Sequence, residues 1–285
     1  MWQTIGFERI KQQFEQLITN NGFGHAYLFS GQEMIGKKTL ALELARLLGV
    51  NEVAFFDGAG GITIDAVRSI KRFSNLKATG TQPKLVILDN AHHLRNDSAN
   101  ALLKVLEEPA ADSLLILISA YPKLLPATIL SRCQIILFPP HTHAQIVEHL
   151  QSIGLSQPQA DWLAQFSNGQ IGWAISLQQR DDLIKIRTYL EQFDQLAKAS
   201  IDERLAFAEK FFTGKKNTSE EGEWSPGRQV AERLLYWLFY LRSPLAKKLK
   251  IDKIKVLRDL LSPRQYLLSP QYNHRLVFEN FLLGI

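Results

Sequence analysis

The residues from Gly31 to Thr39 read GQEMIGKKT and have the spacing of a phosphate-binding loop. In such a loop the glycines let the backbone curl around a phosphate, and a lysine, here Lys37, supplies positive charge. The next position normally carries a hydroxyl that binds magnesium, but here it carries Lys38, and Thr39 comes one position late. Gly31, Gly36, Lys37, Lys38 and Thr39 are therefore candidate residues of a degenerate nucleotide site. The loop either serves as a structural turn or binds ATP or ADP without hydrolysing it.

A second candidate segment, LVILDNAH, ends an apolar run at Asp89. A carboxylate at such a position can hold magnesium through water. The next residue is Asn90, whose amide cannot accept a proton from an attacking water as a glutamate could. Lys38 and Asn90 together predict that the chain hydrolyses no ATP of its own.

A third candidate is Arg132, which follows an apolar strand and a helical segment in the stretch Asn100 to Cys133. A planar guanidinium can neutralise charge on a phosphoryl group during transfer. A lone arginine is more often solvated or paired with a nearby carboxylate, so the residue type leaves both interpretations open. Ser119, at the end of an apolar run, is a weaker candidate, because serines at strand ends usually form turns.

The elements that must position these residues follow from the periodicity of the apolar residues. Short apolar runs alternate with segments of helical spacing, which predicts a parallel α/β sheet. Pro139 and Pro140 cannot continue a central strand and mark the end of this core. The predicted strands are 26–29, 53–56, 85–88, 114–118 and 134–138, and the predicted helices are 7–18, 40–48, 64–76 and 97–107.

Helical patterns dominate after Pro140. We expect an α/β core at 1–138, a small helical domain at 139–185 and an all-helical domain at 186–285. The polar segment Thr213 to Gly227 is predicted to be a loop between two helices.

The composition fits a chain with a sizeable core, since 46% of its 285 residues are hydrophobic. The net charge of +5 permits contact with nucleic acid without requiring it. The single cysteine, Cys133, excludes an internal disulfide, and neither a signal sequence nor a membrane-spanning run is recognisable. We therefore expect a cytoplasmic protein that does not enter the membrane.

The order of motifs from Gly6 to Phe138 resembles that of bacterial clamp-loader subunits of the AAA+ class, above all the delta prime subunits of DNA polymerase III. The resemblance implies a P-loop-type AAA+ core, a helical lid and a C-terminal helical collar. The motifs that carry it are HAYLFSG at 25–31, IGKKTLALELA at 35–45, LDNAHHL at 88–94, NALLKVLEEP at 100–109 and LLPATILSRC at 124–133.

In that family the arginine matching Arg132 acts as a finger in trans on ATP bound by a neighbouring subunit. The resemblance implies gamma/tau motor subunits and a delta subunit as partners, with sliding clamp and primed DNA reached through the complex. It also implies that no cofactor is required. Many relatives hold zinc after the phosphate-loop helix, but no cysteine lies in 48–57, so zinc is not expected. The lid arginine of the family is replaced at Gly172 or Trp173.

Two other functions stay open. The chain is an active gamma/tau-like ATPase if Thr39 or water replaces the missing magnesium ligand. It is a standalone DNA-binding protein if its basic C-terminal stretch binds DNA. That stretch comprises Lys247, Lys248, Lys250, Lys253, Lys255 and Arg258 and is interleaved with Leu249, Ile254 and Leu257.

An apolar stripe, expected to be core or collar, comprises Val230, Leu234, Leu235, Leu238 and Leu241. A metal site is not expected at His92, His93, His141 and His143.

Overall fold

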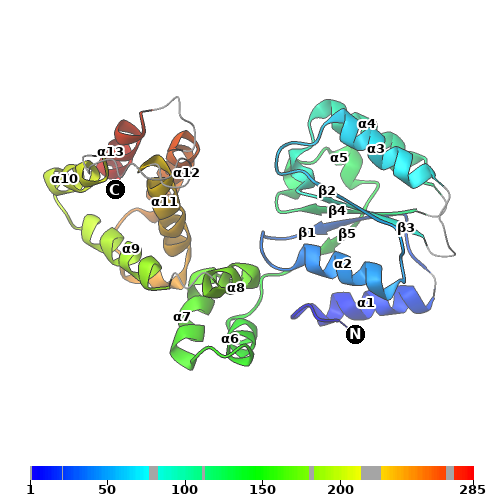
Figure 1. Ribbon diagram of the computed structural model, residues 1–285, viewed down its shortest axis with the longest axis horizontal. Coiled ribbons are helices and arrows are strands. Elements are labelled where there is room, and N and C mark those ends of the chain that lie inside the picture. The colour runs from blue at the N-terminus through cyan, green and yellow to red at the C-terminus, as the bar shows by residue number, and fades with distance from the viewer. Residues whose placement is uncertain are drawn as a thin grey trace, which may run out of the picture. The chain divides into compact units, whose positions relative to one another are not determined.

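The computed structural model describes residues 2–20, 22–76, 83–110, 113–179, 183–212, 226–267 and 273–285. The chain divides into two compact units (Figure 1). The first is Met1–Gly154 with Gly169–Trp173, and the second is Leu155–Asn168 with Ala174–Ile285. The three-domain division at residues 139 and 186 stays a prediction. Residues 213–225 of the expected loop lie outside the described residues.

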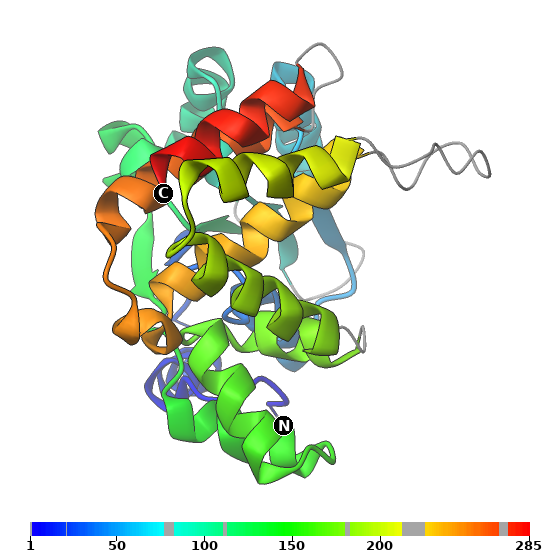
Figure 2. The same ribbon diagram turned by 90° about the vertical axis from the view of Figure 1, so that its left-hand side faces the viewer.

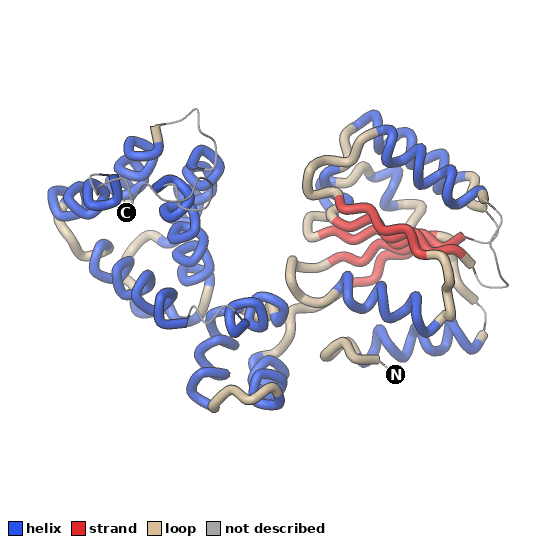
Figure 3. Tube along the Cα trace, in the orientation of Figure 1, coloured by secondary structure: helices blue, strands red, loops and turns tan. Residues whose placement is uncertain are grey.

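The first unit is built on a parallel sheet, which Figure 3 shows between two layers of helices. The strands are ordered β2-β3-β4-β1-β5. Central strands such as β1 are buried throughout, as expected for a parallel sheet covered on both faces. In the described residues the strands are β1 Ala26–Ser30, β2 Val53–Asp57, β3 Lys84–Asp89, β4 Ser113–Ser119 and β5 Gln134–Leu137.

Two apolar clusters hold helices against the two faces of this sheet. Phe14 and Leu44 pack with Phe29 on the face that α1 and α2 cover. Leu102 and Ile129 pack with Leu28 on the opposite face, which α3, α4 and α5 cover. The bounds of these helices are α1 Glu8–Thr19, α2 Lys37–Leu47, α3 Ile64–Asn75, α4 Asn96–Glu107 and α5 Ala127–Leu130.

The register brings the carboxyl ends of the strands to one edge. Ser30 lies beside Ser119 on one side and beside Leu137 on the other, and Asp57 lies beside Asp89. Loops that follow these residues therefore meet at the same edge of the sheet, which is where ligands bind in open α/β sheets.

The helices after the sheet begin with α6 His143–Ser152, where Thr142 and Gln145 form a capping box. In the second unit α11 packs against α9 and α12, while α13 packs against α10 and α12 (Figure 2). The aromatic ring of Trp237 is fully buried there, and its Nε1–H donates to the carbonyl of Tyr189 at 2.7 Å. The other bounds are α7 Gln157–Ser167, α8 Ile171–Gln179, α9 Leu183–Leu196, α10 Ile201–Phe212, α11 Pro226–Arg242, α12 Lys253–Leu267 and α13 His274–Gly284.

Candidate functional site

The predicted phosphate loop joins β1 to α2 at the carboxyl edge of the sheet. Gly36 has a φ of +100°, a conformation that favours glycine, immediately before the first helical residue, Lys37. Gly31 is required because an added Cβ would lie 2.5 Å from the carbonyl oxygen of Phe138. The Gly31–Thr39 segment is thus a strand–loop–helix turn of the expected kind.

The ammonium of Lys37 is turned back onto its own loop. Its Nζ donates to the carbonyl of Gly31 at 2.6 Å and also to the carbonyl of Gln32. Burial lowers the pKa of Lys37 to about 8, although Asp89 and Glu33 act in the opposite direction. In this structure the lysine satisfies loop carbonyls rather than facing an open phosphate site.

Lys38 occupies the position of the missing magnesium ligand and points over β2. Its Nζ lies 3.9 Å from the centroid of the Phe55 ring, a cation–π distance. Its charge also helps to lower the pKa of Asp57, two residues further along the same strand. Thr39 is exposed on α2. Lys38 therefore places a positive charge near Asp57, at the position that normally carries a magnesium ligand.

Asn90 lies next to Asp89 and is bonded to a carboxylate that the sequence analysis did not single out. Its backbone φ is +52°, and its Nδ2 donates to Oδ1 of Asp57 at 2.9 Å. This hydrogen bond is the main cause of a lowered pKa for Asp57, followed by the N–H of Ala59. The backbone N–H of Asn90 donates to Oδ1 of Asp89 at 2.9 Å. The amide thus ties the ends of β2 and β3 together at the position where a hydrolysing site needs a general base.

Ser119, the weaker candidate, lies at the end of β4 and is buried. Its hydroxyl accepts a hydrogen bond from the N–H of Tyr121 at 3.1 Å and lies 3.4 Å from Nδ1 of His92. Its backbone carbonyl accepts the N–H of Gly31 at 3.2 Å. Ser119 therefore acts as a turn residue that also ties β4 to the start of the phosphate loop.

The start of α8 lies directly on the phosphate loop. The N–H of Gly172 donates to the carbonyl of Met34 at 2.7 Å. A Cβ at position 172 would lie 2.8 Å from the same oxygen, so only glycine allows this approach. Met34 itself has a φ of +57°, which is unusual for a side chain of its kind.

A second set of contacts holds the segment before α8 near the same loop. Nε2 of His141 lies 2.9 Å from the carbonyl of Ile35, and the N–H of His141 donates to the carbonyl of Gly169 at 3.0 Å. The His141 ring also lies 4.7 Å from the ring of Phe7. The loop is therefore covered by groups of the chain's own first unit.

Arg132 lies apart from these residues, between α5 and β5. Its NH2 group is 2.7 Å from Oε1 of Glu107, and its NH1 group donates to the carbonyl of Thr128 at 2.9 Å. The arginine side chain is 35% exposed and that of Glu107 is 49% exposed. Glu107 is thus the nearby carboxylate that the sequence analysis considered as an ion-pair partner of Arg132. Both side chains lie on the surface, where another subunit can reach them.

Comparisons with known proteins show which proteins this chain resembles. The model of the family described as "DNA polymerase III, delta subunit" matches residues 50–142. The chain is 29% identical over 209 residues to DNA polymerase III subunit delta' of Bacillus subtilis, covering 63% of the chain and 61% of that protein. It is also 29% identical over 172 residues to subunit tau of the same organism, covering 52% of the chain and 31% of that protein.

A solved structure agrees in fold. A DNA polymerase III gamma subunit-related protein of Thermotoga maritima superposes with a TM-score of 0.55 at 19% identity, covering 95% of this chain and 97% of that one. The chain is thus similar in sequence to clamp-loader subunits of DNA polymerase III, and it shares its fold with a protein related to one of them. It spans about three fifths of the delta' relative and about a third of the tau relative.

The remaining expectations concern the second unit. In the predicted collar stripe Val230, Leu234 and Leu241 are buried, whereas Leu235 and Leu238 are half-buried. In the basic stretch Ile254 is 81% exposed, so it does not face a core. The exposed cations there are Lys247, Lys248, Lys250, Lys255 and Arg258.

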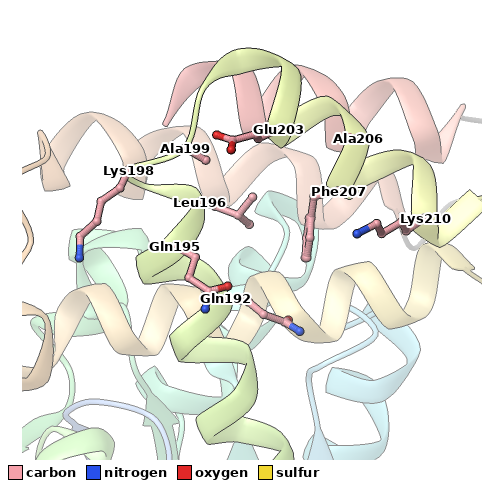
Figure 4. Close-up of a pocket in the computed structure, with 9 residues that line it drawn as sticks. All are labelled: Gln192, Gln195, Leu196, Lys198, Ala199, Glu203, Ala206, Phe207 and Lys210. Atoms are coloured by element: carbon pink, nitrogen blue, oxygen red, sulfur yellow. The ribbon is translucent and has the colours of Figure 1, made fainter.

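The second unit has a groove of about 590 Å³, lined by residues of α9 and α10 and the turn between them. Its lining combines the apolar Leu196 and Phe207 with the charged Lys198, Glu203 and Lys210, and Figure 4 shows these side chains. None of the predicted site residues lies in this groove.

Three further findings limit the chemistry that the described residues can perform. Within the part of the chain that the structure describes, no three His, Cys, Asp or Glu side chains gather to hold a metal ion. Burial raises the pKa of the Cys133 thiol to about 11, so this cysteine is a poor nucleophile. None of the described helices is long and apolar enough to cross a membrane.

The sequence alone did not identify three residues that contact the predicted site residues. Asp57 could have been found, because it ends an apolar strand just as Asp89 does. Glu107 was recognised only as part of a motif, and His141 only as a histidine without a metal. Their contacts join segments far apart in the sequence, and residue spacing does not reveal such contacts.

Proposed function

We propose that the chain is a delta prime-like subunit of a DNA polymerase III clamp loader that hydrolyses no ATP itself. In this proposal it supplies Arg132 as a finger in trans to ATP bound by a neighbouring subunit while the sliding clamp is loaded during DNA replication. An arginine finger neutralises the charge that develops on the transferred phosphoryl group, an effect on the order of 10³ to 10⁵ in rate.

The observation that carries the proposal is the position of Arg132 relative to the sheet, just before β5. Strand β5 runs parallel to β1, with Gln134 beside Tyr27 and Leu137 beside Ser30. The phosphate loop follows Ser30 at the carboxyl edge, whereas Arg132 precedes β5 at the amino edge. The three steps from Gln134 to Leu137 alone span roughly 10 Å at about 3.3 Å per residue. Arg132 lies two residues further away, so it is remote from the chain's own phosphate loop, and in this proposal its guanidinium serves a ligand outside its own nucleotide site.

The nucleotide site itself supports a role without hydrolysis. Lys37 is bonded to the carbonyls of its own loop, and Gly172 is bonded to Met34 of that loop. Asn90 replaces the general base and is bonded to Asp57. ATP would have to displace the first two contacts and would still find no base, so tight binding and turnover are both disfavoured. Gly31 and Gly36 would then shape the loop, and Lys38, Thr39 and Asp89 would serve no cofactor.

The partners in this proposal are the gamma/tau motor subunits and the delta subunit, with the sliding clamp and primed DNA reached through the assembled complex. Clamp-loader subunits are among the relatives to which this chain is similar. No zinc or other cofactor is part of the proposal, and the cytoplasm is the expected location. The exposed basic residues of the second unit are then a solvated surface of the complex.

The first test is ATP turnover by the purified chain with magnesium, beside the variant Lys37→Ala. The proposal predicts no turnover by either protein, and co-purification of the chain with gamma/tau subunits. Turnover by the wild-type chain that Lys37→Ala abolishes would replace the proposal with an active gamma/tau-like ATPase. Salt-sensitive binding of primed DNA by the chain alone, without association with gamma/tau subunits, would favour the DNA-binding alternative.

A further inference from the structure

Arg132 is held by oxygen atoms from two helix ends. Glu107 is the last residue of α4, and its Oε1 lies 2.7 Å from NH2 of Arg132. Thr128 lies in the single turn of α5, and its carbonyl accepts from NH1 at 2.9 Å. The hydroxyl of Ser131 lies 3.4 Å from the same NH1 group. The guanidinium thus bridges α4 and α5, which pack against one another.

These contacts fix the plane of the guanidinium. Its two terminal nitrogens are bonded to different elements, so rotation about the end of the side chain would break at least one contact. A guanidinium has five N–H donors in a rigid fork, and the contacts formed within the described chain leave donors for a phosphate. The side chain of Arg132 is 35% exposed, so a ligand from outside can approach it.

We propose that Glu107 is a positioning residue, which holds the Arg132 guanidinium in the orientation that the neighbouring subunit's ATP requires. This inference rests on the proposed function, and it names a second residue on which the action of Arg132 depends. A long, flexible side chain loses conformational freedom when it is fixed, and a partner within the same chain removes that cost before the subunits meet. Glu107 does not touch the ATP, and it acts only through Arg132.

Such a role affects the chemical step more than the binding of ATP. A finger contacts charge that develops in the transition state, so a misdirected guanidinium lowers kcat and leaves KM for ATP unchanged. Misplacement of a catalytic group by about 1 Å can cost roughly 100-fold in rate. We expect loss of Glu107 to lower kcat for ATP hydrolysis roughly 10- to 100-fold at the site that Arg132 serves. This loss is smaller than the loss expected when Arg132 itself is removed.

The test uses the complete clamp loader, reconstituted with its motor subunits, clamp and primed DNA. ATP hydrolysis per site is measured in single turnovers for Glu107→Ala, Glu107→Gln and Arg132→Ala. Glu108→Ala is the matched control, because Glu108 is the next residue, is also exposed to solvent and carries the same charge. Gel filtration shows whether each complex is intact, and thermal melting of the free chain shows whether each variant folds.

The inference predicts that Glu107→Ala lowers kcat with KM unchanged. Glu107→Gln retains an oxygen that can accept the hydrogen bond, so its rate lies between those of Glu107→Ala and the wild type. Glu108→Ala keeps the wild-type rate. If Arg132→Ala impairs hydrolysis but Glu107→Ala does not, or if Glu107→Ala raises the rate, the role of Glu107 is refuted and the proposed function stands. If Arg132→Ala itself has no effect in an intact complex, the proposed function fails first.

Discussion

A methyl group added at position 172 should loosen the contact between α8 and the phosphate loop. The N–H of Gly172 donates to the carbonyl of Met34 at 2.7 Å, and a Cβ there would lie 2.8 Å from that oxygen and 3.4 Å from the carbonyl carbon. Both atoms belong to the backbone and cannot rotate away as a side chain would. In Gly172→Ala the two segments must therefore separate.

The size of the effect follows from three contributions. Overpacking costs about 1–3 kcal/mol, and loss of the hydrogen bond costs about 0.5–1.5 kcal/mol. The smaller conformational freedom of alanine in the unfolded chain returns about 0.4–1 kcal/mol. We expect the local opening free energy to fall by about 0.5–4 kcal/mol, which lowers the protection of the amide at position 172 by about 2- to 1000-fold.

Amide hydrogen exchange on the purified chain measures this protection directly. Gly60→Ala is the matched control, because a Cβ at Gly60 would meet no atom within 4 Å. We expect Gly60→Ala to leave the protection at position 172 unchanged. Equal or higher protection in Gly172→Ala would refute the reasoning, since it would mean that α8 does not depend on a close approach to Met34.

Two further predictions concern stability. Because burial lowers the pKa of Lys37 from 10.5 to about 8, the unfolded chain binds more protons than the folded chain between these values. The contribution of Lys37 to stability therefore rises with pH over that interval, and Lys37→Met should flatten the rise in urea midpoint from pH 7 to 10; an identical pH profile for the variant would contradict this. Trp237→Ala should destabilise the second unit by about 3–5 kcal/mol, because the ring is fully buried and bonded to the carbonyl of Tyr189. A loss below about 1 kcal/mol in urea unfolding, within the range of a surface substitution, would contradict that packing.

The sheet could be predicted from the sequence because its strands are buried on both faces. Runs such as Leu85 to Leu88 are apolar without interruption, and each predicted strand agrees with the structure to within one residue at either end. The helical patterns also placed α1, α3 and α4 to within one residue. The short helix α5 was not given bounds, because four residues are too few for a helical period to be recognised.

The candidate site was predictable only where one segment carries the signal. The spacing of Gly31, Gly36 and Lys37 predicts a strand–loop–helix turn, and the structure has that turn. The bond from Asn90 to Asp57 and the approach of Gly172 to Met34 depend on how distant segments pack. No local period or propensity encodes these contacts.

The most direct test of the account is DNA-stimulated ATP hydrolysis by the reconstituted clamp loader with Arg132→Ala in this chain alone. Arg68→Ala is the control, because Arg68 forms an exposed ion pair with Asp65, 3.0 Å away. We expect both variants to assemble into complete complexes. Hydrolysis should be lost at one motor site with Arg132→Ala and retained at all sites with Arg68→Ala. Wild-type hydrolysis by an intact Arg132→Ala complex would contradict it and leave this chain with a structural role alone.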